Sequence, residues 1–181
     1  MTGITIFASP WWVNLLFLVP IVTYLLSRNA KIQLSRKQLL IIAIFGIAFG
    51  LAEAAVEADL MAATGLWPAP QVNHPAILSP DLARIERFRQ AATIVMLGSI
   101  AWIATQNLKA RVAAFLWAFA FWDFFYYVWL RVTTGWPTSL LSTDILFLIP
   151  VPWISQVWYP LLISSLTAAV IWSRSEKSSP S

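Results

Sequence analysis

Two glutamates, Glu53 and Glu57, stand four residues apart in a long apolar stretch of the chain. Because an α-helix has about 3.6 residues per turn, this spacing places both carboxyl groups on one face of a helix. A charged side chain near the centre of a membrane-spanning helix costs about 2.5 to 3.5 kcal/mol on insertion scales. Two of them on one face therefore require partners or a function.

Further ionisable and hydroxyl side chains lie in later apolar stretches at helical spacing. Glu86 and Arg89 are three residues apart, and Asp123 is followed by tyrosines and by an arginine. The sequence predicts one ligand-binding cluster, with the members Glu53, Glu57, Glu86, Arg89, Asp123, Tyr126, Tyr127, Arg131 and Asp144. His74, in a proline-rich loop, and Asp144 are candidate lids of this cluster.

Each of these charged residues also has a purely structural interpretation. Glu86 with Arg89, and Asp123 with Arg131 or Arg89, could be buried ion pairs that only fix the helix register. Pairing cannot be complete, because the same half of the protein holds seven acids and at most four arginines. The sequence predicts that protonation, a bound cation or water compensates the difference.

Composition excludes several classes of chemistry. The chain has no cysteine, which excludes disulfides, thiolate nucleophiles, iron-sulfur clusters and thiolate metal sites. Its single histidine excludes haem held by two histidines and the paired Glu-x-x-His motif of di-iron bundles. Carboxylate oxygens suit a hard divalent cation instead, and its candidate ligands are Glu53, Glu57, Glu86 and Asp123.

The elements that would position these residues are predicted to be transmembrane helices. The chain is 59% apolar and 11% charged, with a mean hydropathy of +0.72, which is typical of an integral membrane protein. The prediction is an all-α, polytopic helical bundle with five transmembrane helices, over residues 10–26, 38–63, 82–106, 112–134 and 152–172. These helices form a single transmembrane domain, residues 1–173, followed by a cytoplasmic tail, residues 174–181.

Local residues predict several boundaries. Ser79, followed by Pro80, predicts the start of the third helix, and Gly135 predicts the end of the fourth. Residues 138–149 are apolar but only twelve residues long, against about 20 needed to cross a bilayer. With prolines on both sides, they predict a short interfacial or re-entrant helix.

The distribution of basic residues predicts the orientation. Eight of the twelve fall on one side of the predicted bundle: Arg28, Lys31, Arg36, Lys37, Lys109, Arg111, Arg174 and Lys177. The positive-inside rule makes that side cytoplasmic, so the N-terminus and the acidic cluster face outward. We expect the bacterial inner (plasma) membrane. The basic residues form no continuous stripe, so no nucleic acid is expected as a partner.

Three functions fit these features. The first is binding, with transport, of a cation, a proton or a polar lipid head group at the outward-facing cluster. The second is an intramembrane enzyme in which Glu53 or Asp123 is the general acid acting on a lipid-soluble, isoprenoid-like substrate. The third is a small structural subunit of a larger membrane complex. The expected partners are the lipid bilayer and either further copies of the chain or other subunits.

Overall fold

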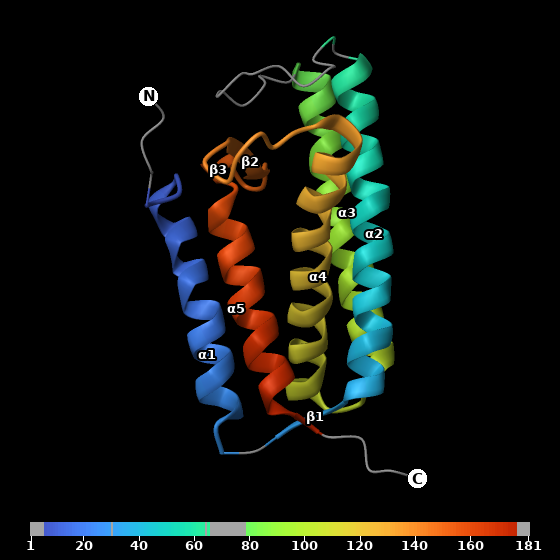
Figure 1. The fold of residues 1–181 in the computed structure, drawn as a ribbon, viewed down its shortest axis with the longest axis vertical. Helices are drawn as coiled ribbons and strands as arrows, with labels where there is room; N and C mark the ends of the chain where they lie inside the picture. The colour runs from blue at the N-terminus through green and yellow to red at the C-terminus, as the bar shows by residue number, and fades with distance from the viewer. Residues whose placement is uncertain (1–5, 30, 64, 66–78, 177–181) are drawn as a thin grey trace.

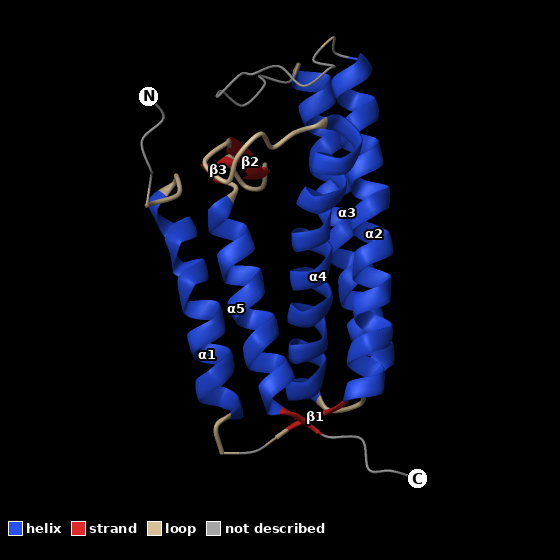
Figure 2. Cartoon of the chain, in the orientation of Figure 1, coloured by secondary structure: helices blue, strands red, loops and turns tan. Residues whose placement is uncertain are grey.

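The computed structural model describes residues 6–29, 31–63, 65 and 79–176. Helices make up most of this part of the chain: η1 (a 3-10 helix, Trp11–Phe17), α1 (Leu18–Ser27), α2 (Arg36–Ala63), α3 (Pro80–Ala104), α4 (Leu108–Thr134) and α5 (Trp158–Arg174). The described strands are short: β1 (Ile32–Ser35), β2 (Thr143–Phe147), β3 (Trp153–Gln156) and β4 (Ser175–Glu176). The helices run side by side in one bundle (Figure 1), and Figure 2 shows strands at both of its ends.

Helix α4 lies at the centre of the bundle and packs against α2, α3 and α5, while α1 packs against α5. Two glycines of α2 allow the closest of these approaches. A Cβ atom added at Gly46 would lie 2.8 Å from Cβ of Phe121, and one added at Gly50 would lie 2.9 Å from the backbone nitrogen of Tyr126. The α2–α4 distance therefore depends on the absence of side chains at these two positions.

Tryptophans of α4 fix the same interface. The indole N–H of Trp117 donates a hydrogen bond of 2.7 Å to the carbonyl of Leu39, and that of Trp129 donates one of 3.0 Å to the carbonyl of Ile47. A buried indole N–H without an acceptor would cost about 1–3 kcal/mol. These bonds allow Trp117 and Trp129 to pack against α2 without that cost.

Two helix ends follow the local sequence, as predicted. The hydroxyl of Ser79 accepts a hydrogen bond from the N–H of Leu82, and Pro80 begins α3. Gly135 ends α4 with a φ of 80°, in the left-handed region that glycine adopts readily. Both predictions are confirmed.

The prediction of five transmembrane helices is wrong. Among the described residues, only α2 and α4 are long and apolar enough to cross a membrane. Helix α3 carries several charged residues in its N-terminal part, α5 has only 17 residues, and the apolar stretch Trp11–Ser27 is also short. Two such helices are compatible with a membrane protein, and a five-span bundle is not supported.

Residues 138–149 do not form the expected interfacial or re-entrant helix. Strand β2 pairs with β3 in an antiparallel hairpin, in which Asp144 lies opposite Ser155. Isoleucine and phenylalanine favour a strand, and the prolines at 150 and 152 favour the turn that joins the two strands. Because β3 takes residues assigned to the fifth helix, α5 begins at Trp158.

At the opposite end of the bundle, the end of α5 is joined to the segment after α1 by backbone hydrogen bonds and by the guanidinium of Arg174. Strand β4 pairs in parallel with β1. The guanidinium of Arg174 donates hydrogen bonds of 2.6 and 2.7 Å to the carbonyls of Ser27 and Arg28. Residues 174–176 thus contact the loop after α1. The rest of the predicted tail, residues 177–181, lies outside the described residues.

The close approach of α2 and α4 gives a first prediction. Replacing Gly50 by alanine should lower the free energy of unfolding by about 1–3 kcal/mol, because the added Cβ meets the backbone of α4, which cannot rotate away. Gly98→Ala is the matched control, since nothing lies within 4 Å of its added Cβ. Denaturation of both variants in one detergent measures the difference. Equal stabilities would show that α2 can retreat from α4 at no cost.

Candidate binding site

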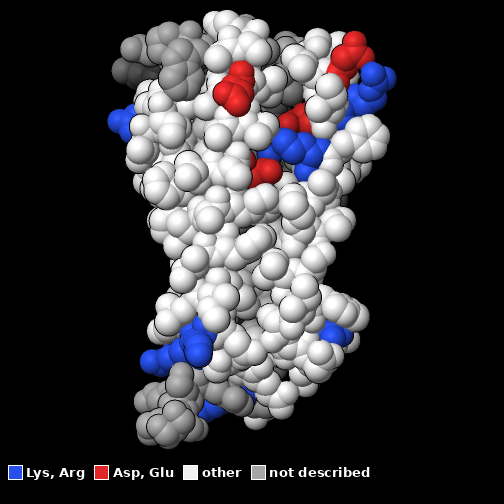
Figure 3. All heavy atoms as spheres, turned by 90° about the vertical axis from the view of Figure 1, so that its right-hand side faces the viewer, with Lys and Arg blue, Asp and Glu red and all other residues white. Residues whose placement is uncertain are grey.

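The predicted site residues meet at the end of the bundle that carries the hairpin. A small cavity of about 50 Å³ lies there, which we call the acidic cavity. Eight of the nine predicted residues line it: Glu53, Glu57, Glu86, Arg89, Asp123, Tyr126, Tyr127 and Asp144. Figure 3 shows charged side chains near this end and near the opposite end, with an uncharged surface between them. That these residues bind a ligand stays a prediction.

Arg89 joins the two helices on one side of the acidic cavity. It forms an ion pair with Glu53 of α2 and another with Glu86 of its own helix, where Nε lies 2.8 Å from a carboxylate oxygen. Gln90 donates a further hydrogen bond to Glu86 and accepts one from the backbone N–H of Leu148 after β2. The ion pair proposed for Glu86 and Arg89 is therefore present, and Glu53, only 6% exposed, shares it.

Three acids of the acidic cavity have no cationic partner among the described residues. Asp123 accepts a hydrogen bond of 2.7 Å from the hydroxyl of Ser164 in α5. Asp144 accepts one of 2.7 Å from the hydroxyl of Tyr127. The side chain of Glu57 forms no ion pair with the described part of the chain. The ion pairs of Asp123 with Arg131 or Arg89 that the sequence suggested are not formed there.

Burial raises the pKa of Asp144 above its ordinary value of 3.8. The hydrogen bonds from Tyr127 and from the backbone N–H of Ile145 oppose this rise, because they stabilise the ionised form. Removal from water is the larger effect. The protonated form of Asp144 is thus favoured more strongly in the folded protein than in the unfolded chain.

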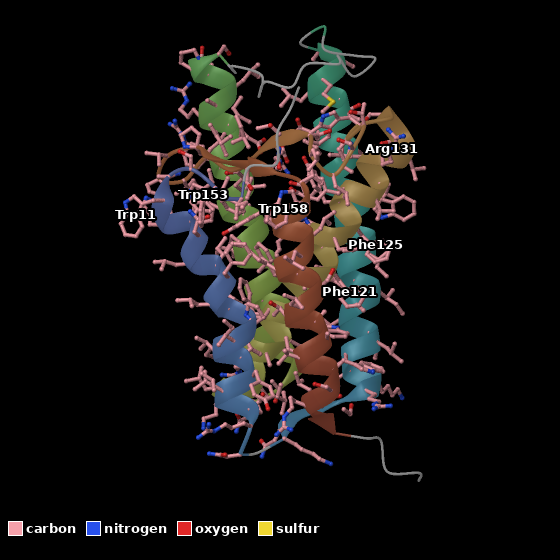
Figure 4. All side chains as sticks on the ribbon, turned by 60° about the vertical axis from the view of Figure 1, so that its left-hand side comes forward. Trp11, Phe121, Phe125, Arg131, Trp153 and Trp158 are labelled. Atoms are coloured by element: carbon pink, nitrogen blue, oxygen red, sulfur yellow. The ribbon has the colours of Figure 1, made fainter. Side chains whose placement is uncertain are left out.

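Arg131, which was also named from the sequence, does not line the acidic cavity. Arg131 donates hydrogen bonds to the carbonyls of Gly135 and Pro137, the latter at 3.1 Å. It thereby joins the end of α4 to the loop that follows, on the side of the bundle away from α1 (Figure 4). His74 lies outside the described residues.

The geometry does not favour the divalent cation. Within the described residues, no group of three acidic or histidine side chains is placed to hold one metal ion. Two of the four candidate ligands, Glu53 and Glu86, already contact the guanidinium of Arg89. Asp123 and Glu57 come from different helices and, among the described residues, have no third carboxylate in a chelating position.

A second cavity, which the sequence did not predict, adjoins the first. It has a volume of about 540 Å³ and a mostly apolar lining from η1, α1, α3, α4, α5 and the hairpin; we call it the apolar cavity. The two cavities share Trp122, Asp123, Leu146 and Phe147. Figure 4 shows Trp153, another residue of its lining, at the level of the hairpin beside α1.

Polar residues that the sequence analysis missed also belong to this region. Gln90 and Thr93 line the acidic cavity from the same face of α3 as Glu86, at spacings of four and seven residues. Ser164 and Thr167, three residues apart in α5, line the apolar cavity. Their spacing could have been recognised, because polar residues that recur on one face of an apolar helix indicate a polar contact inside a bundle.

The position of Arg89 gives a second prediction. Arg89→Met should lower the free energy of unfolding by about 3–5 kcal/mol, because it leaves two buried carboxyl groups without their cation. Arg84→Met is the control, since Arg84 pairs with Asp81 on the surface and such pairs contribute about 0–1 kcal/mol. Thermal and chemical denaturation in detergent compare the two variants. A small loss for Arg89→Met would mean that the carboxyl groups do not need the guanidinium.

Asp144 gives a third prediction, on pH dependence. The pKa of Asp144 in the folded protein lies above 3.8, so the folded state binds this proton more tightly than the unfolded chain does. The protonated Asp144 therefore stabilises the fold at low pH, and this stabilisation is lost as the pH rises from about 3.8 through the folded pKa. Asp144→Asn keeps an acceptor for Tyr127 and should reduce this fall in stability. Asp59→Asn, at an exposed position, controls for the change from acid to amide. Identical pH profiles of the parent and Asp144→Asn would contradict the prediction.

Comparisons of the chain with protein-family models, with curated proteins and with solved structures gave no match. The function is therefore argued from the two cavities and the groups that line them.

Proposed function

We propose that the protein binds an amphiphilic molecule, with its polar head in the acidic cavity and its apolar body in the apolar cavity. The observation that carries this proposal is the shared wall: Trp122 and Asp123 line both cavities. A buried carboxyl group thus stands where a small polar space meets a large apolar one. A ligand that fills both spaces must be polar at one end and apolar over most of its length.

The cavity volumes support a compact head and a substantial body. About 50 Å³ is room for one or two groups of the size of a water molecule, such as an ammonium or a hydroxyl group. About 540 Å³ falls within the range of 300–1,000 Å³ that is typical of sites for small organic ligands. A bulky phosphodiester head would not fit the acidic cavity at this volume.

The charges favour a cationic head. Glu57, Asp123 and Asp144 have no cationic partner among the described residues, and a cationic head would stabilise their ionised forms, whereas an anionic head would not. A primary ammonium group offers three hydrogen-bond donors to these acceptors. The rings of Trp122 and Tyr126, which also line the acidic cavity, favour a cation by their negative faces.

The surroundings of the cavities support a location in a membrane. The apolar cavity is lined by Leu16 and Val19 on one side and by Ala91 and Ile94 of α3 on another. Large apolar side chains on the outer faces of these helices, such as Ile103, are exposed, which suits contact with lipid. We infer a plasma membrane protein whose basic end faces the cytoplasm, so that an amphiphile reaches the acidic cavity from the outer leaflet.

Acid catalysis is a second candidate function, favoured by the position of Asp123. Its carboxyl group contacts Ser164 and faces the junction through which the ligand would pass. A protonated Asp123 could transfer its proton to an isoprenoid double bond, with aromatic rings nearby to stabilise the resulting cation. Glu53 is the weaker candidate because it is paired with Arg89. Conversion of a polyprenyl alcohol, followed by mass spectrometry and lost in Asp123→Asn, would distinguish catalysis from binding.

Binding of a long-chain amine gives the fourth prediction. Hexadecylamine should bind the purified protein and raise its melting temperature, whereas palmitate, an anion of similar length, should not. Asp123→Asn should weaken the binding of hexadecylamine about thirtyfold or more, because truncating one partner of a buried charge pair costs about 2 kcal/mol or more.

The matched control is Asp81→Asn, a substitution at an exposed residue outside both cavities. It should bind hexadecylamine as the parent does. Equal effects of the amine and of palmitate would show that the carboxyl groups do not recognise the head. No effect of either probe would count against the proposed function as a whole.

A further inference from the structure

Most polar side chains buried in the helices have a partner within the protein. The hydroxyls of Thr23, Thr93 and Thr134 donate hydrogen bonds of 2.7, 3.1 and 2.8 Å to the carbonyl four residues earlier. The indole N–H groups of Trp117 and Trp129 donate to carbonyls of α2. This is the expected pattern, because an unpaired buried polar group costs about 1–3 kcal/mol.

Three buried polar atoms depart from this pattern. Nε1 of Trp122, Nε1 of Trp153 and Oγ1 of Thr167 have no hydrogen-bond partner among the described residues. They come from α4, β3 and α5, and all three residues line the apolar cavity. Two other buried side-chain atoms in the described chain have no hydrogen-bond partner; one belongs to Arg36 and the other to the ion-paired Arg89. Unpaired polar groups are thus concentrated around one cavity.

Two of these groups belong to indole rings that pack edge-on against other aromatic rings. Trp122 meets the ring of Phe119 at a centroid distance of 5.1 Å and 70°, and Trp153 meets Trp12 at 5.1 Å and 90°. Aromatic faces accept hydrogen bonds only weakly. Thr167, which is 3% exposed, does not bond the carbonyl four residues earlier. Its hydroxyl remains without an acceptor from the described chain.

We propose that the ligand of the apolar cavity is an oxygenated lipid, whose body carries oxygen atoms that accept hydrogen bonds from Trp122, Trp153 and Thr167. The inference rests on the proposed function and adds the class of the ligand to it. An indole N–H can only donate, so its partner must be an acceptor, such as a carbonyl, ether or hydroxyl oxygen. A plain hydrocarbon chain would leave all three groups unpaired.

The structure also indicates where one oxygen should lie. Ser164 holds Asp123 at the junction of the cavities, and Thr167 follows three residues later on the same side of α5. At a rise of about 1.5 Å per residue, Thr167 is about 4.5 Å further along the apolar cavity. An oxygen a few carbon atoms from the ligand head therefore fits the Thr167 hydroxyl.

The test compares hexadecylamine with a series of keto-hexadecylamines that carry one carbonyl at successive positions along the chain. Each is titrated into the purified full-length protein, and the dissociation constant and the shift in melting temperature are measured. At least one analogue, with its carbonyl a few carbons from the amine, should bind about fivefold or more tightly than hexadecylamine, which corresponds to one additional buried hydrogen bond.

Two variants identify the donors. Trp122→Phe and Thr167→Val remove an unpaired polar group but keep most of the side-chain volume. Without ligand, both should be at least as stable as the parent, because the unpaired group is lost. In one or both, the dissociation constant of the keto analogue should become equal to that of hexadecylamine measured in the same variant. Trp158→Phe and Thr133→Val are the matched controls, since Trp158 donates to Gln156 and Thr133 to Trp129.

The outcomes separate the two proposals. A keto analogue that binds more tightly, with the preference lost in Thr167→Val or Trp122→Phe and kept in both controls, supports the oxygenated lipid. If hexadecylamine binds and no keto analogue binds more tightly, the oxygenated lipid is overturned while the proposed function stands. If the preference is unchanged in both variants, the inference is also overturned. If no amine binds at all, the proposed function fails, and the inference fails with it.

Discussion

One guanidinium group between two helices controls the charged end of this protein. Arg89 is ion-paired with Glu53 of α2 and with Glu86 of its own helix, so it neutralises charge and joins α2 to α3 at once. It cannot also serve the acids on α4 and β2. On one side of the acidic cavity, Arg89 neutralises the carboxyl groups of Glu53 and Glu86. On the other side, Asp123, Asp144 and Glu57 have no cationic partner among the described residues, and a ligand head could bind there.

The spacing of residues predicted which side chains meet, because four residues in a helix give one face regardless of how the helix is packed. Glu53 and Glu57 follow this rule, and so do Glu86 and Arg89. Helix ends with their own local chemistry, such as Ser79 and Gly135, were also predictable. Arg131 was placed in the site because it shares a face with Tyr127, but nearby loop carbonyls bind its guanidinium instead.

The parts that could not be predicted depend on contacts between distant residues. Asp144 faces the acidic cavity because β2 pairs with β3, and a twelve-residue apolar stretch does not show by itself whether it will find a strand partner. The number of membrane-crossing helices was overestimated because apolar composition shows neither that α5 is too short nor that the charged residues of α3 lie within the helix. The apolar cavity arises where α1 packs on α5 and α3 packs on α4, and no single segment of sequence contains it.

The hairpin that lines both cavities determines their polarity through its strand register. Asp144 pairs with Ser155, and hydrogen bonds of 2.9 and 2.7 Å between Ser9 and Ile154 attach the hairpin to the segment before η1. Side chains alternate between the two faces of a strand, so a shift of one residue would exchange the acid for a neighbouring threonine or isoleucine. Insertions or deletions in the short turn after Phe147 are therefore a route by which related proteins could change the polarity of the cavity without altering any helix.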